Sequence, residues 1–185
     1  MKKTRIPPML ADLVLMTIVA CDGILFDEAA ACPHCGGEPG GYDVKRKQFA
    51  IVTDRGKRRV ISVLVRRFRC RNCRQITYAG QPFYPDTRIG SPVIDLCRTL
   101  GETMPYGRVS SCLADMGVVV DRWSVRNYVK GNTLPVPAAD MFGVRVPLSL
   151  VSLSTLAGTL PEGRRMDARS VLAAFGYPSA SHLPD

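Results

Sequence analysis

Two Cys-x-x-Cys pairs constrain this chain more than any other feature of its sequence. Cys32 and Cys35 form the first pair, and Cys70 and Cys73 form the second after a gap of 34 residues. Each such turn aims two thiolates at one point, so two turns complete the tetrahedral shell of a zinc ion. Four thiolates leave no open coordination position, which indicates a structural rather than a catalytic Zn²⁺.

The segment between the two pairs has the composition of a β-hairpin. The gap is longer than the roughly 15–20 residues of common four-cysteine sites, so the chain must fold back on itself. Residues 42–53 and 58–69 are rich in strand-forming residues, and Gly56 between them can supply the positive φ of a tight turn. Folding about this turn sets Cys70 opposite Gly41, beside the first pair.

The net charge of +9 is concentrated in this hairpin. Residues 41–80 carry twelve basic and two acidic side chains, whereas the rest of the chain is close to neutral. We expect so many like charges to require an outside anion, and a phosphate backbone fits better than a merely solvated surface. The hairpin residues expected to contact DNA are Arg58, Arg59, Arg66, Arg67, Arg69, Arg71 and Arg74.

Four aromatic side chains accompany these charges. We expect Tyr42, Phe49, Phe68 and Tyr78 to fill the hairpin core rather than to form a stacking platform. Binding of single strands is therefore not the favoured interpretation.

From Ser91 the pattern becomes helical. It predicts helices over 92–101, 106–116 and 122–130, with Ser91 capping the first and Asp121 the third. Three short helices, the last two joined by a glycine-containing turn, outline a helix-turn-helix unit.

The helix at 122–130 divides into two faces. A wheel of about 100° per residue places Val125, Tyr128 and Val129 on a packing face. Arg126 and Asn127 lie on the other face and match the edges of guanine and adenine in the major groove. The expected DNA-contacting residues of this helix are Arg122, Trp123, Arg126, Asn127 and Lys130.

The first thirty residues predict a short packing helix at 9–21. A basic start and an apolar run before Cys21 are similar to a lipoprotein signal, but Asp12 and the prolines at 7–8 interrupt the run. The run is also shorter than the ~20 residues of a membrane span. Seven cysteines are an odd number, which excludes a fully paired disulfide framework and favours a reducing cytoplasm.

The predicted fold is therefore α+β, with a four-cysteine zinc ribbon followed by a helix-turn-helix unit of three helices. The expected segments are an N-terminal helix with its connection (1–30), a zinc-binding basic β-hairpin (31–78), a linker (79–90), the helix-turn-helix unit (91–131) and a C-terminal helical segment of unassigned role (132–185). Cys21, Cys97 and Cys112 are expected in the core. Within the last segment we expect helices in "PLSLVSLSTLAGTL" and, between Asp167 and Gly176, in "DARSVLAAFGYP", but no alternating strand pattern.

Four sequence features together resemble the amino-terminal DNA-binding region of insertion-sequence transposases: "CPHCGG", "VRRFRCRNCRQ", a proline-rich linker with "FYPDTR", and the helices up to Lys130. That resemblance implies a four-cysteine zinc finger followed by a helix-turn-helix, with Cys32, Cys35, Cys70 and Cys73 as ligands. Such transposases also carry an RNase-H-like catalytic core, which needs more than ~100 residues. Only 54 residues with four acidic side chains follow Gly131, so we do not expect an enzyme.

We therefore predict a zinc-stabilised protein that binds double-stranded DNA sequence-specifically, either as a regulator or as the DNA-binding half of a transposition system. It would be cytoplasmic and nucleoid-associated, without membrane contact, and compatible with a homodimer. Two alternatives stay open. One is a zinc-ribbon interaction module that docks an acidic protein partner, and the other is a transposase whose catalytic part lies on another chain.

Overall fold

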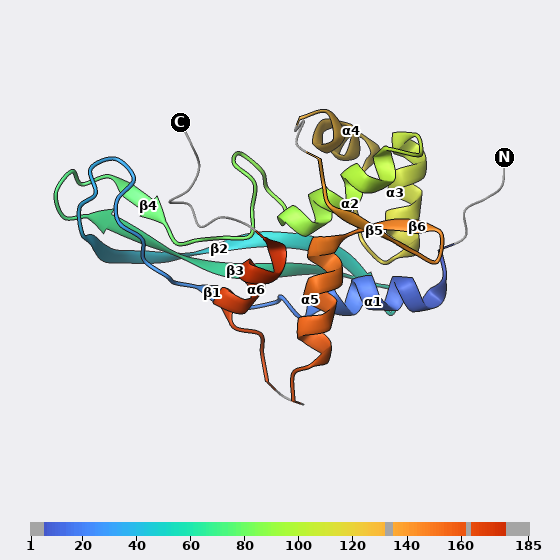
Figure 1. Cartoon of the computed structure of the whole chain (residues 1–185), viewed down its shortest axis with the longest axis horizontal. Helices are drawn as coiled ribbons and strands as arrows, with labels where there is room; N and C mark the ends of the chain where they lie inside the picture. Colours follow the sequence, from blue (N-terminus) through green and yellow to red (C-terminus); the bar gives the residue numbers. More distant parts are fainter. Residues whose placement is uncertain (1–5, 132–134, 162–163, 177–185) are drawn as a thin grey trace.

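The structure is a computed structural model that describes residues 6–131, 135–161 and 164–176. Within these ranges the chain has a mixed α+β architecture, which confirms the expected class (Figure 1). The elements in chain order are α1 (Pro8–Val19), β1 (Leu25–Phe26), β2 (Pro39–Asp54), β3 (Lys57–Cys70), β4 (Ile76–Tyr78), α2 (Ser91–Gly101), α3 (Tyr106–Asp115), α4 (Arg122–Lys130), β5 (Ala138–Met141), β6 (Val144–Pro147), α5 (Leu148–Gly158) and α6 (Ala168–Phe175).

The predicted hairpin is confirmed as the antiparallel pair β2–β3, which turns at Arg55 and Gly56, both with positive φ. Its register differs from the expected one, because Cys70 lies opposite Pro39 rather than Gly41. The register skips Tyr42 and Phe49, so each forms a bulge that adds one residue to β2. Two bulges account for the shift of two residues.

Two further strands extend this sheet. β1 pairs with β3 in parallel and β4 pairs with it antiparallel, so both lie on the edge of β3 opposite to β2. They are two and three residues long, too short to give a periodic signal in the sequence. As a result β2 forms one edge of the sheet.

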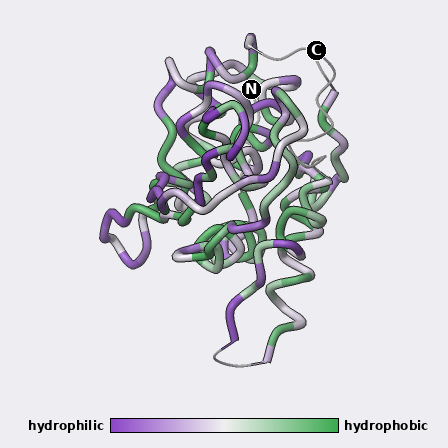
Figure 2. The backbone as a smooth tube through the Cα atoms, turned by 90° about the vertical axis from the view of Figure 1, so that its left-hand side faces the viewer, coloured by the Kyte–Doolittle hydropathy of each residue, from purple (hydrophilic) through white to green (hydrophobic). Residues whose placement is uncertain are grey.

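One hydrophobic cluster joins the sheet to the helices. Ile61, Val63 and Val65 on β3 are fully buried in it, and α1 contributes Leu10 and Val14 among others. The prediction of an N-terminal packing helix is thus confirmed. Figure 2 looks from the end at which the cysteine-containing loops lie, and it shows hydrophilic stretches on outer loops around a largely hydrophobic interior. Within the described ranges, no helix combines the length and apolarity that crossing a bilayer requires.

The segment before α2 packs closely against the hairpin. Phe83 and Ile89 are buried, and the ring of Phe83 meets that of Phe49 edge to face at 6.2 Å. A Cβ atom at Gly90 would lie 2.3 Å from the Phe49 ring, so only glycine fits there. The helix then begins at Ser91 itself, with Gly90 as its N-cap. The expected cap by Ser91 is wrong, because its hydroxyl donates instead to the carbonyl of Pro82 (3.0 Å).

Both helices predicted near the C-terminus are confirmed as α5 and α6. Asp167 caps α6, and Gly176 ends it with a left-handed backbone (φ 63°). The expected absence of strands in this segment is wrong, because β5 and β6 form a hairpin that turns at Phe142 and Gly143, both with positive φ. Each strand has only four residues, which hid the alternation.

Candidate metal centre and nucleic-acid interface

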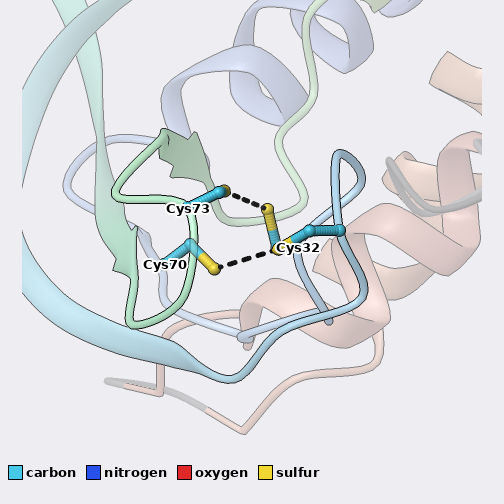
Figure 3. A group of neighbouring side chains, drawn as sticks. Cys32, Cys70 and Cys73 are labelled. Carbon is cyan, nitrogen blue, oxygen red and sulfur yellow. Dashed lines mark hydrogen bonds between the residues drawn. The ribbon is translucent and has the colours of Figure 1, made fainter.

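The four cysteines of the two pairs converge in space, and Figure 3 shows how Cys32, Cys70 and Cys73 point toward one another. Sγ of Cys32 lies 3.6 Å from that of Cys73, Sγ of Cys35 lies 3.5 Å from that of Cys70, and all four sulfurs lie within 4.8 Å of one another. A tetrahedral ion with metal–sulfur bonds of about 2.3 Å requires sulfurs about 3.8 Å apart. A disulfide would require about 2.05 Å. The cluster can therefore hold a metal ion.

The two cysteine turns have the same backbone geometry. In the first, the Gly36 amide donates to the Cys32 carbonyl (2.8 Å) and the Cys32 amide to the Gly37 carbonyl (3.0 Å). In the second turn, the Arg74 amide donates to the Cys70 carbonyl (3.1 Å) and the Cys70 amide donates to the Gln75 carbonyl (2.9 Å), at the same spacing in the sequence. Gly36 and Arg74 occupy equivalent positions with φ of 67° and 64°. Two matching turns thus face each other across the cluster.

Gly37 allows the two turns to approach. A Cβ atom at this position would lie 2.9 Å from Sγ of Cys70 and 2.8 Å from Nδ2 of Asn72. The Arg71 amide also donates to the Glu38 carbonyl (3.0 Å), which ties the turns together beside the sulfurs. Gly37 is not among the predicted site residues, although its place two residues after Cys35 is a signal for close backbone approach.

The pKa values of Cys70 and Cys73 show that the neighbouring sulfurs do not form thiolates equally easily. The amides of Cys73 and Asn72 donate to Sγ of Cys70 and lower the pKa of this thiol to about 6. Although the Gln75 amide acts in the same sense on Cys73, burial and the neighbouring sulfurs raise its pKa to about 12. One thiolate thus forms readily, while a further thiolate is opposed by the crowded sulfurs. A bound cation removes that opposition.

The remaining cysteines are core residues, as predicted. Cys21, Cys97 and Cys112 are all buried. Burial raises the pKa of Cys97 to about 12, so its thiol stays protonated and unreactive at neutral pH.

The predicted hairpin arginines do not share one face. Side chains alternate along a strand, so Arg58 and Arg66 point to one face of β3, whereas Arg59, Arg67 and Arg69 point to the other. Arg58, Arg59, Arg69, Arg71 and Arg74 are exposed, and Arg66 and Arg67 are half-buried. In the described part of the chain, Nε of Arg66 is buried without a hydrogen-bond partner. The basic groups therefore surround the hairpin.

Three of these arginines have acidic partners within the chain. The pairs are Arg59–Asp22 (2.7 Å), Arg67–Asp43 (2.5 Å) and Arg71–Glu38 (3.1 Å). The expectation that the hairpin cations require an outside anion is wrong for Arg59 and Arg71, because Asp22 and Glu38 reach them from outside residues 41–80. The Arg67 guanidinium holds the pKa of Asp43 below its usual range. Arg58, Arg69 and Arg74 have no ion-pair partner among the described residues.

Two of the four aromatic side chains are not where the sequence placed them. Phe49 and Phe68 are buried as predicted. The prediction is wrong for Tyr42 and Tyr78, which are 50% and 37% exposed. Tyr42 forms a bulge in β2 and Tyr78 ends β4, and neither feature follows from the strand pattern.

The faces of α4 agree with the wheel prediction. Val125 is buried and Tyr128 and Val129 are half-buried, whereas Arg122, Trp123, Arg126, Asn127 and Lys130 are exposed. Trp123 is 68% exposed, and the Arg126 guanidinium lies 5.4 Å from the centre of its ring. The exposed face thus offers cations, an amide and an indole to solvent.

Two local contacts fix the position of α4. The predicted cap is confirmed, since Asp121 accepts hydrogen bonds from the amides of Trp123 and Ser124 (both 2.9 Å). The Ser124 hydroxyl and amide hold the pKa of Asp121 below its usual value. Against α2, a Cβ atom at Gly101 would lie 2.7 Å from Val129, so the two helices touch at a glycine.

Comparison of the chain with protein-family models, curated proteins and solved structures gave no match.

Proposed function

We propose that this chain is a zinc-stabilised protein that binds double-stranded DNA, related to the DNA-binding part of a transposition system. The observation that carries the proposal is the union of a four-sulfur cluster with a hairpin that bears twelve basic residues. Among the residues that the structure describes, three intramolecular ion pairs neutralise part of this charge. The remaining cations favour a polyanion as the partner.

Zinc is the ion that this donor set favours, because four thiolates in a tetrahedral arrangement match its ligand preference. Its role would be structural. The ion would fix the end of the hairpin at which β2 is exposed, since residues 41–46 of that strand have no buried side chain. Cys32, Cys35, Cys70 and Cys73 would be the four ligands.

The hairpin would supply affinity through the phosphates. β3 has fourteen residues, which at about 3.3 Å each span about 46 Å. At 3.4 Å per base pair that length follows about 13 base pairs of duplex. Arg69 and Arg74 are exposed near the cysteines at one end of this length, and Arg58 is exposed near the turn at the other end, on the opposite face of β3 from Arg69. Such contacts position a protein without specifying sequence.

The exposed face of α4 would supply the sequence preference. Arg126 and Asn127 present the side chains that pair with guanine and adenine edges in the major groove. Arg122 and Lys130 lie at the two ends of the helix, where they would contact phosphates. α2, α3 and α4 would act together as a helix-turn-helix unit.

Binding to random duplex and to selected duplex at two salt concentrations tests this proposal. We expect affinity for both to fall steeply with salt, because binding releases counter-ions. Arg69→Ala should weaken all sequences alike and flatten the salt slope, whereas Arg126→Ala should reduce the preference for the selected site by about 1–3 kcal/mol. Arg164→Ala, which removes an exposed arginine outside both surfaces, is the control. No binding of duplex at low salt would refute the proposal.

A second candidate function rests on the outer edge of β2. The outward backbone groups of Phe49, Ile51 and Thr53 are bonded to neighbouring loops, but Val44–Gln48 has no such partner in the described part of the chain. Lys45, Arg46 and Lys47 line this edge. It could add an extended acidic segment of a protein partner as a further strand. Binding of an acidic peptide but not of duplex would favour this function.

A further inference from the structure

Three neighbouring strands place Tyr42, Arg67 and Tyr78 in one row across the sheet. In the register, Arg67 of β3 lies opposite Asp43 of β2 on one side and Tyr78 of β4 on the other. Tyr42 forms the bulge next to Asp43. The Arg67 guanidinium carbon lies 5.4 Å from the centre of the Tyr42 ring and 6.0 Å from that of Tyr78. Two aromatic rings thus flank one planar cation.

The ion pair with Asp43 holds the centre of this row. Nε of Arg67 donates to Oδ1 of Asp43 (2.6 Å), and Nη2 donates to Oδ2 (2.5 Å). A bidentate pair fixes the plane of the guanidinium, and it leaves the arginine little charge to offer a phosphate. Arg67 therefore acts here as a flat support between the two tyrosines.

The rings are accessible, and beside them lie cations that have no acidic partner among the described residues. Tyr42 is 50% and Tyr78 37% exposed. Lys45 and Arg69 are each two residues along a strand from the row, on the same face, and both are exposed. Nζ of Lys47 lies 5.8 Å from the centre of the Tyr78 ring, and these two residues help to line a cavity of about 1270 Å³.

We propose that Tyr42 and Tyr78 form a stacking platform for unpaired nucleobases, with Lys45 and Arg69 on the phosphates of the same strand. The inference rests on the proposed function in that the partner is a nucleic acid, and it adds a second substrate class, single strands. Bases in a duplex stack on one another and offer no free face, whereas aromatic rings beside cations suit an unpaired strand of either DNA or RNA.

The test measures fluorescence anisotropy with a labelled 15-mer of dT, a 15-mer of rU and a random duplex of the same length. The variant is the double substitution Tyr42→Ala with Tyr78→Ala, and Tyr42→Phe with Tyr78→Phe is its matched partner that keeps both rings. Phe142→Ala removes an aromatic side chain that is 60% exposed at the β5–β6 turn, and serves as the control. Zinc content and circular dichroism verify that each variant is folded.

We expect the double alanine variant to lose at least fivefold in affinity for the better-bound single strand and less than twofold for duplex. The double phenylalanine and Phe142→Ala variants should stay within twofold of the parent for every probe. The platform is refuted by an unchanged single-strand affinity, by an equal loss on duplex, or by a phenylalanine variant as weak as the alanine one. The dT and rU arms show which strand is the better ligand.

The same titrations separate this inference from the proposed function. A parent protein that binds duplex but neither single strand would refute the platform and leave duplex binding intact. One that binds single strands but not duplex would refute the proposed function and keep the platform, provided that the alanine variant shows the loss. Binding of no probe would refute both.

Discussion

Replacing Gly37 by alanine tests the metal centre most directly. The new Cβ would lie 2.9 Å from Sγ of Cys70, whereas ordinary contacts begin at 3.4 Å, so the sulfur would have to move by about 0.5 Å. The Asn72 side chain, which the Cβ would also meet, is exposed and can turn away. A ligand sulfur cannot, because metal–ligand distances hold to within about 0.2 Å. The backbone of Gly37 has no positive φ, so an alanine adds steric conflict but no backbone strain.

We expect Gly37→Ala to weaken zinc binding by about ten- to a hundredfold, the range seen when groups that orient metal ligands are altered. This corresponds to about 1.4–2.8 kcal/mol. Competition with a chromophoric chelator measures the affinity. Gly41→Ala is the matched control, because a Cβ atom at Gly41 meets nothing within 4 Å and its φ is not positive either. Equal zinc affinities for both variants, or an equal loss in both, would show that the sulfur cluster does not depend on this approach.

Three further predictions concern ligation, packing and capping. Cys35→Ser leaves three sulfurs, and we expect elemental analysis to find no stoichiometric zinc in the purified variant. Gly90→Ala drives a methyl group into the Phe49 ring and should lower the free energy of unfolding by about 1–3 kcal/mol in urea titrations; no loss would mean that the ring can move aside. Asp121→Ala should cost about 1 kcal/mol at pH 7, while Asp121→Asn keeps the cap. Because the folded-state pKa of Asp121 is depressed, its contribution is present above the unfolded value of about 3.9 and is lost as the pH falls through the lower folded value. The difference between the parent and Asp121→Ala should therefore shrink as the pH falls below about 4, and a difference that does not change between neutral and acidic pH would contradict this.

The sequence predicted those features that depend on spacing and local chemistry. The four cysteines converge because two like turns at the ends of a hairpin must meet, and the length of the gap already required the hairpin. The packing face of α4 could be predicted from helical periodicity, because Tyr128 and Val129 follow Val125 at intervals of three and four residues. Asp121 and Asp167 marked helix starts, because a carboxylate there satisfies free amides.

Features that depend on register and on long-range packing could not be predicted. The bulge at Tyr42 shifts the ladder by one residue, and the ring of this residue, which was expected in the hairpin core, is exposed. The pairing of Asp22 with Arg59 joins residues 37 positions apart, so charge counting by segment overlooked it. Strands β1, β4, β5 and β6 are too short for a periodic signal, and sheet context alone stabilises them.

The distribution of burial along the hairpin determines which part of it a bound ion would stabilise. Near the turn, Ala50 and Val52 of β2 are buried against the helices, but residues 41–46 of the same strand are all exposed. At that far end β3 contributes Phe68 and Cys70 as buried side chains but β2 contributes none between residues 41 and 46, so a metal ion bound by the cysteines would add local folding free energy there. We therefore expect chelation to raise amide hydrogen exchange in residues 39–46 and 66–75 while Ile61 and its neighbours stay protected. Uniform loss of protection would mean that the whole fold depends on the ion, and unchanged exchange would mean that the sulfur cluster is not a structural metal site.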